Sequence, residues 1–302
     1  MKGIILAGGS GSRLYPLTTI MSKQLLPVYD KPMIHYPLST LMMLGIRDIM
    51  IISTPEDTPH IQKHFGDGAQ YGISLEYKVQ DEPKGIGEAF VLAEDFIGDD
   101  RVCLILGDNI FYLGSQINDI AERMEVEKDK NIIFGYHVID PERFGVIEFD
   151  EKEQVVSIEE KPKKPKSNYA AAGLYFYQND VVKKAKRIKP SPRGELEITD
   201  INVECLKEGK LDVINFKRGS AWLDAGTPES LADAAEYMRL IFRRQGLKIS
   251  CLEEVAYIKG FITRQTLMDS IDGIKDGLDY KEYLQQVLGE TQVKVQVDPR
   301  GN

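Results

Sequence analysis

The chain has 302 residues, of which 42% are hydrophobic and 28% charged, and its formal net charge is −9. This length and composition are typical of a globular protein with one large α/β domain and an appendage, or with two domains. The negative charge argues against nucleic acid or an anionic membrane as the main partner. No apolar run approaches the roughly 20 residues that span a bilayer. Three scattered cysteines, Cys103, Cys205 and Cys251, predict reduced, mostly buried thiols and a cytoplasmic protein.

Short apolar runs alternate with stretches of helical spacing through the first half of the chain. Strands are predicted at residues 3–7, 48–52, 74–79, 102–106 and 131–137, and helices at 33–44, 57–65, 86–96 and 115–128. This alternation predicts a doubly wound, mostly parallel, Rossmann-like α/β sheet. Ligands bind such a sheet beyond the carboxyl ends of its strands.

The middle of the chain changes character. Short strands are predicted at residues 145–149, 155–159 and 172–177, with a hairpin turn at 150–154, and another strand at 211–216. Thr227-Pro-Glu-Ser predicts the start of a long helix to about residue 245, because proline and an acid favour the first turn. Helical stretches follow at 253–259, 264–270 and 280–288. The sequence therefore predicts a core over residues 1–226, with an inserted small β region, and a helical region over 227–302.

A glycine-rich turn follows the first predicted strand. It consists of Gly8, Gly9, Ser10, Gly11 and Ser12. Glycines at a strand exit let the backbone turn tightly and bring its N–H groups close to a ligand. Arg13 adds a guanidinium that matches phosphate geometry, and Lys23 adds a mobile cation. These features indicate a polyphosphate site, with a plain loop as the alternative. The P-loop motif is absent, and the dinucleotide fingerprint fails because Leu14 stands where its third glycine belongs.

Two aspartates are candidate ligands for a divalent cation. Asp108 follows the predicted strand at residues 102–106, so it should face the ligand crevice, and Asp224 lies in Ala221-Trp-Leu-Asp-Ala-Gly-Thr227. For each, the alternative is an aspartate that caps a turn or a helix. Mg²⁺ commonly takes one or two carboxylates together with phosphate oxygens. The residues alone leave open whether these two aspartates meet.

The N-terminal stretch resembles the sugar-1-phosphate nucleotidyltransferases. The resemblance rests on the pattern G-G-x-G-[ST]-R-L-x-P-L-T at residues 8–18 and K-x-L-[LV]-P-[VI] at residues 23–28, and it extends to about Gly260. The fuller string Ser22-Lys-Gln-Leu-Leu-Pro-Val-Tyr-Asp-Lys-Pro-Met-Ile is similar to the members that use dTTP and glucose 1-phosphate. The resemblance implies an enzyme that depends on Mg²⁺, makes dTDP-glucose for deoxysugar synthesis such as that of dTDP-rhamnose, and forms a homotetramer through its C-terminal helices.

The same resemblance implies roles for individual residues in a nucleotide-binding part over about residues 1–110. Asp108 in Leu106-Gly-Asp-Asn and Asp224 in Trp222-Leu-Asp-x-Gly-Thr would hold Mg²⁺. Arg13 would bind the β- and γ-phosphates and Lys23 the α-phosphate, alongside the glycine turn. The base would be read by Gln24, Gln80 and Gly85, since a primary amide can pair with the donor–acceptor edge of thymine or uracil.

A sugar-phosphate part is implied over about residues 111–226. Lys161 would hold the sugar phosphate, and Glu160 would accept hydrogen bonds from sugar hydroxyls; without the resemblance, both would be interpreted as a surface loop. Further sugar contacts are implied at Asn109, Gly145, Ala171 and Tyr175. Where close relatives read Val-Thr-Gly, this chain has Ala171-Ala172-Gly173, which predicts a roomier sugar pocket and a less strict preference for glucose.

Three other functions are alternatives to this activity. A uridylyltransferase that makes UDP-glucose is the nearest alternative. A non-catalytic regulator that binds nucleotide sugars on the same fold is a second, but the presence of Asp108, Lys161 and Asp224 together argues against it. A Rossmann dehydrogenase is disfavoured by the failed glycine spacing.

Overall fold

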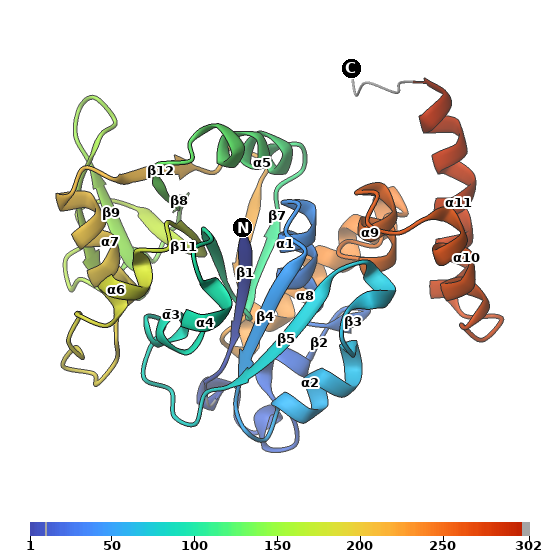
Figure 1. Ribbon diagram of the computed structural model, residues 1–302, viewed down its shortest axis with the longest axis horizontal. Helices are drawn as coiled ribbons and strands as arrows, with labels where there is room; N and C mark the ends of the chain where they lie inside the picture. The colour runs from blue at the N-terminus through green and yellow to red at the C-terminus, as the bar shows by residue number, and fades with distance from the viewer. Residues whose placement is uncertain (10, 298–302) are drawn as a thin grey trace.

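The structure, a computed structural model, describes residues 1–9 and 11–297, with side chains for residues up to 289 other than Ser10. Within these residues, the centre of the molecule is a sheet of nine strands (Figure 1). Four parallel strands form one half of it in the order β5–β4–β1–β6. They are β1 (Lys2–Ala7), β4 (Asp48–Ser53), β5 (Ser74–Val79) and β6 (Val102–Leu106). Each lies within one residue of its prediction, and the α/β fold class is confirmed.

The middle strands extend this sheet and do not stand apart as a separate β region. They are β8 (Asn131–His137), β9 (Gly145–Phe149), β10 (Val155–Glu160), β11 (Tyr169–Tyr177) and β12 (Leu211–Asn215). Strand β11 runs antiparallel to β6 and also pairs with β8 and β9, so it joins the two halves. The predicted hairpin joins β9 to β10, and its turn is closed by Asp150 N–H donating to the Gln154 carbonyl at 2.9 Å.

Helices cover both faces of the sheet, because successive side chains of a strand point to opposite sides. Ile5 of β1 packs in one apolar cluster with α1 (His35–Met43), α2 (Thr58–Phe65) and α5 (Gln116–Val126). Its neighbour Ile4 packs in a second cluster with α3 (Glu88–Leu92), α4 (Glu94–Ile97), α6 (Val181–Ala185) and α7 (Ile198–Lys207). This arrangement is the doubly wound sheet that the alternating pattern predicts.

One local prediction was wrong, and some short strands were not predicted. The single helix expected over residues 86–96 is interrupted at Ala93 and forms the short helices α3 and α4. Two pairs of short strands were also missed: β2 (Pro27–Val28) with β3 (Lys31–Pro32), and β7 (Asn109–Tyr112) with β13 (Ala221–Asp224). Strands of two to four residues are too short to show a hydrophobic period, yet the β7–β13 pair proves decisive for the site.

The C-terminal region is helical, as predicted. It contains α8 (Pro228–Gln245), α9 (Leu252–Ile258), α10 (Arg264–Asp272) and α11 (Asp279–Val297). The Thr227 side chain caps α8 by accepting a hydrogen bond from the Ser230 backbone N–H at 3.2 Å. In Figure 1, α10 and α11 lie at the opposite end of the molecule from α6 and α7. None of the described helices has the length and apolarity needed to cross a membrane. The three cysteines are buried thiols, as expected.

Candidate active site

A cavity of about 530 Å³ opens beyond the carboxyl ends of β1 and β6. Nine of the predicted site residues line it: Arg13, Asp108, Asn109, Gly145, Glu160, Lys161, Ala171, Tyr175 and Asp224. A second cavity of about 520 Å³ touches the glycine turn at Gly9 and also includes Lys23 in its wall. The site therefore lies at the edge of the sheet where a parallel α/β fold binds its ligands.

The two aspartates meet because of the short β7–β13 ladder. Asp108 immediately precedes β7 and Asp224 ends β13, and the register pairs Asp224 with Asn109. The Ala225 backbone N–H donates to the Asp108 carbonyl at 3.1 Å, which extends the pairing past the end of the strand. The question that the residues alone left open is thereby answered: both carboxylates stand side by side at the cavity.

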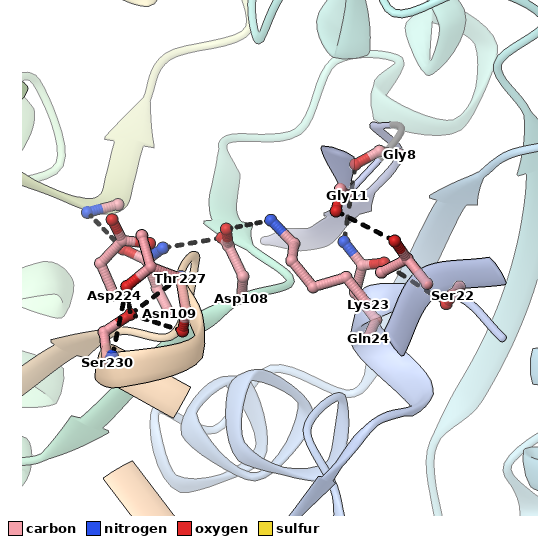
Figure 2. Close-up of polar contacts among 12 residues, drawn as sticks. Gly8, Gly11, Ser22, Lys23, Gln24, Asp108, Asn109, Asp224, Thr227 and Ser230 are labelled. Atoms are coloured by element: carbon pink, nitrogen blue, oxygen red, sulfur yellow. Dashed lines mark hydrogen bonds and ion pairs between the residues drawn. The ribbon is translucent and has the colours of Figure 1, made fainter. Parts of the chain in front are cut away.

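Lys23 and Asn109 approach Asp108 from opposite sides (Figure 2). The Lys23 ammonium forms an ion pair with one carboxylate oxygen, and Asn109 Nδ2 donates to the other at 2.9 Å. Burial acts to raise the pKa of Asp108, but the Lys23 cation and these hydrogen bonds outweigh burial, so the pKa lies below its ordinary value. Asp108 is therefore ionised at neutral pH and held in a single orientation.

The pKa of Asp224 is shifted in the opposite direction. Burial, and next the Asp108 carboxylate, raise the pKa of Asp224 to about 6, although Lys23, Arg13 and Arg143 act to lower it. Two carboxylates that repel each other form a suitable binding site for a divalent cation. No third acidic, histidine or cysteine ligand joins them among the described residues, so an ion bound here would complete its coordination with substrate oxygens and water.

Asp224→Asn is expected to stabilise the metal-free protein at pH 8. The pKa of Asp224 is higher in the folded protein than the ordinary 3.8. The protonated Asp224 carboxyl therefore contributes fully to the stability of the fold below about pH 4, and this contribution is lost as the pH rises through about 6. At pH 8 the ionised carboxylate costs on the order of 1–3 kcal/mol, which the amide avoids. Thermal melting in EDTA should give a higher Tm than wild type at pH 8 and a similar Tm near about pH 4. A Tm lowered equally at both pH values would contradict this electrostatic picture.

Asn109 also connects β11 and Trp222 to Asp108 through hydrogen bonds. Its Oδ1 accepts hydrogen bonds from Trp222 Nε1 at 2.7 Å and from the Gly173 backbone N–H at 3.2 Å. A side chain at Gly173 would collide with this amide oxygen, so the glycine is required by close packing. Asn109 is buried, with 2% of its surface exposed. Its hydrogen bond to Asp108 orients that carboxylate. The resemblance implied only a sugar contact for it.

Apart from Asn109, the predicted sugar-binding residues lie on β9, β10 and β11 or, for Lys161, directly after β10. Thr199 Oγ1 donates to Glu160 Oε2 at 2.6 Å, and the Lys161 ammonium lies 3.7 Å from Glu160 Oε1. Lys161 has a φ of 43°, a left-handed conformation that is strained for a side chain of this kind and is common at functional sites. Tyr175 is almost fully buried in the cavity wall.

Sequence reasoning missed several residues that line the same cavity: Arg143, Arg193, Glu195, Thr199 and Trp222. Arg193 is held by carboxylates, above all by Glu197, which its Nη2 contacts at 2.8 Å through both carboxylate oxygens. These residues come from a loop, a 3₁₀ turn, the start of α7 and the short strand β13, none of which carries a local pattern. Only their folded positions reveal them.

Two of the three predicted base-binding residues, Gln24 and Gln80, lie at the end of β1. Gln24 Nε2 donates to the Gly8 carbonyl at 3.5 Å, and both Gln24 and Gln80 are buried. A side chain at Gly8 would collide with Gln80 Oε1. Gln80 Nε2 donates to Glu88 Oε2 at 2.7 Å. Because an ionised carboxylate only accepts, Glu88 fixes which end of the Gln80 amide faces Gly8.

The glycine turn has the backbone shape that its composition predicts. Gly9 and Gly11 have φ values of 107° and 58°, in the left-handed region, and Ser12–Leu14 forms a short 3₁₀ turn. The Arg13 guanidinium packs beside Gly226, where an added Cβ would lie 2.8 Å from Arg13 Nη2. Ser10, also predicted to bind nucleotide, lies outside the described residues.

Glycine is required at position 85 for a structural reason that the sequence did not suggest. Its φ is 99°, and a Cβ atom would lie 2.5 Å from the Leu196 backbone nitrogen. The adjoining backbone pairs with Leu196, whose N–H donates to the Lys84 carbonyl at 2.7 Å and whose carbonyl accepts from Gly87 N–H at 2.9 Å. The close approach that this glycine permits is therefore to another segment of the chain.

Comparisons with known proteins agree with this geometry. A family model described as nucleotidyl transferase matches residues 2–239. A glucose-1-phosphate thymidylyltransferase of Neisseria gonorrhoeae is 51% identical over 290 residues, which cover 96% of this chain and all of that protein. A crystal structure from Bacillus anthracis, bearing the name glucose-1-phosphate thymidylyltransferase and containing a sucrose, is 46% identical, with a TM-score of 0.74 over 79% of this chain and 95% of that one. A UDP-glucose pyrophosphorylase complexed with UDP-glucose is 24% identical, with a TM-score of 0.70 over 79% of this chain and 98% of that one, and shows the fold alone.

Proposed function

The chain belongs to the nucleotidyl transferase family, and we propose that it transfers a thymidylyl group from dTTP to glucose 1-phosphate, forming dTDP-glucose and pyrophosphate. The observation that carries the proposal is the pair Asp108 and Asp224, brought together by the β7–β13 ladder at a cavity that also contains Lys161. Relatives about half identical to this chain bear the name of that activity.

The reaction needs positioning and charge neutralisation more than covalent help from the protein. An oxygen of the glucose 1-phosphate attacks the α-phosphorus of dTTP in line, a new P–O bond forms, and the bond to the leaving pyrophosphate breaks with its electron pair. The attacking oxygen is already anionic, so no general base has to remove a proton. The remaining task is to align two polyanions that repel each other.

Residues of the two cavities would share that task. Arg13 would bind the β- and γ-phosphates as the pyrophosphate departs, and Lys23 the α-phosphate. Lys161 would hold the sugar phosphate in line. Glu160, oriented by its 2.6 Å hydrogen bond from Thr199, would accept hydrogen bonds from sugar hydroxyls, and Gly145, Ala171 and Tyr175 would form the adjoining wall.

A magnesium ion fits the donor set, since Asp108 and Asp224 supply two carboxylates whose mutual repulsion a cation relieves. When bound, it would neutralise phosphate charge and polarise the α-phosphoryl group. Lys23 and Asn109 keep Asp108 ionised and oriented for this role.

Lys161→Ala is expected to weaken use of the sugar phosphate more than use of dTTP. Loss of one charge-assisted contact costs roughly 1.5–3 kcal/mol, so kcat/KM for glucose 1-phosphate should fall about 10- to 100-fold. Lys164→Ala is the matched control, because Lys164 is an exposed lysine of the same basic loop. If both variants retain wild-type kinetics for glucose 1-phosphate, Lys161 belongs to the solvated surface of that loop.

The proposed function is tested by the release of pyrophosphate from a panel of nucleoside triphosphates and hexose 1-phosphates. We expect the highest kcat/KM for dTTP with glucose 1-phosphate. A preference for UTP would instead favour the uridylyltransferase, and binding without turnover would favour the non-catalytic regulator. Activity with other hexose 1-phosphates would agree with the small side chain of Ala171, which lines the cavity. Ala172, also expected to widen the sugar pocket, packs in the hydrophobic core instead.

The proposal includes assembly as a homotetramer, with the C-terminal region over residues 227–302 at subunit contacts. Exposed apolar side chains on α8 to α10 support it: Leu240, Ile258 and Met268 are 51%, 63% and 38% exposed. Light scattering coupled to gel filtration measures the oligomeric state directly.

A further inference from the structure

Arg143 is a cation of the cavity to which no role has been assigned. It ends the 3₁₀ turn Pro141–Arg143, just before Phe144 and β9. Its Nη1 lies 2.6 Å from Asp140 Oδ2, and its Nη2 lies 3.8 Å from Asp224 Oδ2. The second distance is too long for a hydrogen bond. Nη2 therefore has no hydrogen-bond partner within the described part of the chain.

The backbone places Arg143 next to Lys161. The Lys161 N–H donates to the Phe144 carbonyl at 3.0 Å, and the β9–β10 register pairs Gly145 with Glu160. Both cations line the same cavity. Two positive side chains from adjoining strand ends thus flank one part of the cavity, beside the Asp224 carboxylate.

Arg143 is held less firmly than Arg193, another cation of the cavity. Arg193 is bound by Glu197 through both carboxylate oxygens and also contacts Glu195 at 3.2 Å. The only ion pairs of Arg143 are the short one to Asp140 and the long one to Asp224, among the residues that the structure describes. Its side chain is 40% exposed and forms part of the wall of a neighbouring cavity of about 150 Å³. The guanidinium therefore has space to move and free donors to offer.

We propose that the Arg143 guanidinium binds the phosphate of the sugar phosphate, together with Lys161, and so positions it for attack. A planar fork of N–H donors matches two phosphate oxygens, which a lysine ammonium cannot do. Asp140 tethers one side of the fork and leaves the other directed at the cavity. This inference rests on the proposed function, since it assigns a residue to the sugar-phosphate half of that reaction.

The test compares Arg143→Lys and Arg143→Ala with wild type at saturating dTTP. We expect KM for glucose 1-phosphate to rise about 10- to 100-fold in the alanine variant, as for loss of a charge-assisted hydrogen bond, while KM for dTTP changes little. The lysine variant should recover only part of the loss, because it restores the charge but not the fork. Arg239→Lys and Arg239→Ala are the matched controls: Arg239 is 38% exposed and pairs with Glu236 at the same i,i+3 spacing, on α8.

Calorimetry supplies a readout that does not depend on turnover. Binding of dTDP-glucose should weaken in both Arg143 variants, whereas binding of dTMP, which lacks the sugar phosphate, should stay at the wild-type value. Equal weakening of both ligands would show a general structural defect and overturn the inference. So would full recovery by Arg143→Lys, which would mean that a positive charge near Asp224 is all that the site requires. Thermal melting establishes that each variant is folded.

The same measurements distinguish a wrong assignment of the activity from a wrong role for Arg143. If wild type neither turns over dTTP nor binds dTDP-glucose, the thymidylyl assignment is wrong, whatever Arg143 does. The same pair of measurements is then made with the nucleotide that wild type does use, its diphospho-sugar and its monophosphate. If wild type works as proposed and Arg143→Ala binds dTDP-glucose normally, only the role of Arg143 is refuted.

Discussion

Asp108→Asn and Asp224→Asn are each expected to reduce turnover on the order of 1,000-fold while the protein remains folded. A metal ion that stabilises transition-state charge supplies several kcal/mol, and each ~1.4 kcal/mol corresponds to a tenfold change in rate. The amide preserves the shape of the side chain but lacks the charge that holds the ion. Steady-state kinetics over a range of Mg²⁺ concentrations, together with Mn²⁺ binding followed by electron paramagnetic resonance, measure both effects.

Asp48→Asn is a suitable control for these variants. Asp48 is an exposed aspartate at the amino end of β4 that pairs with Lys2 at 3.4 Å, far from the cavity. It should retain wild-type turnover and Mn²⁺ binding. Near wild-type turnover of either Asp108→Asn or Asp224→Asn at saturating Mg²⁺ would disprove the metal assignment.

The second large effect expected is on the choice of nucleotide. The enzyme should discriminate weakly between thymine and uracil and strongly against the other bases. We expect the order dTTP, then dUTP and UTP, then dCTP, with dATP and dGTP near background. Thymine and uracil share a donor–acceptor edge and differ by one methyl group, which is worth only about 1–3 kcal/mol in a pocket. Cytosine exchanges donor and acceptor at part of that edge and leaves buried polar groups unpaired, which costs more. Purines should fail on size.

If Gln80 reads the base, its contact with Glu88 gives a reason why it would not adapt to cytosine. Its Nε2 donates to the Glu88 carboxylate at 2.7 Å, so a flip of the amide would bring Oε1 against an oxygen that only accepts. The orientation therefore stays suited to thymine and uracil. Measuring kcat/KM for each triphosphate with glucose 1-phosphate tests the order. Activity with dCTP or dGTP comparable to that with dTTP would refute both the edge-reading role of Gln80 and the thymidylyl assignment.

Much of the fold follows from local sequence. Strands β6 and β8 have the ends that the apolar runs predict, because burial on both faces of a sheet requires an unbroken run of apolar side chains. The edge strand β5 also has its predicted ends, which follow from its alternating sequence. The glycine turn at the end of β1 could be predicted too, since only glycine adopts its positive φ values at Gly9 and Gly11 without strain. These are properties of single segments, which is why the residues alone determine them.

Tertiary structure decided what could not be seen in any one segment. The meeting of Asp108 and Asp224 depends on β7 and β13, two strands too short to show a pattern, whose pairing is set by the packing of the whole core. The approach of Arg143 to Lys161 depends likewise on the β9–β10 hairpin and its register. Contacts between distant segments carry no local signal, because a residue's own period and propensity say nothing about which strand it will face. The sequence by itself therefore determined the parallel strands, most of the helices and the glycine turn, and only the folded chain decided which charges share the cavity.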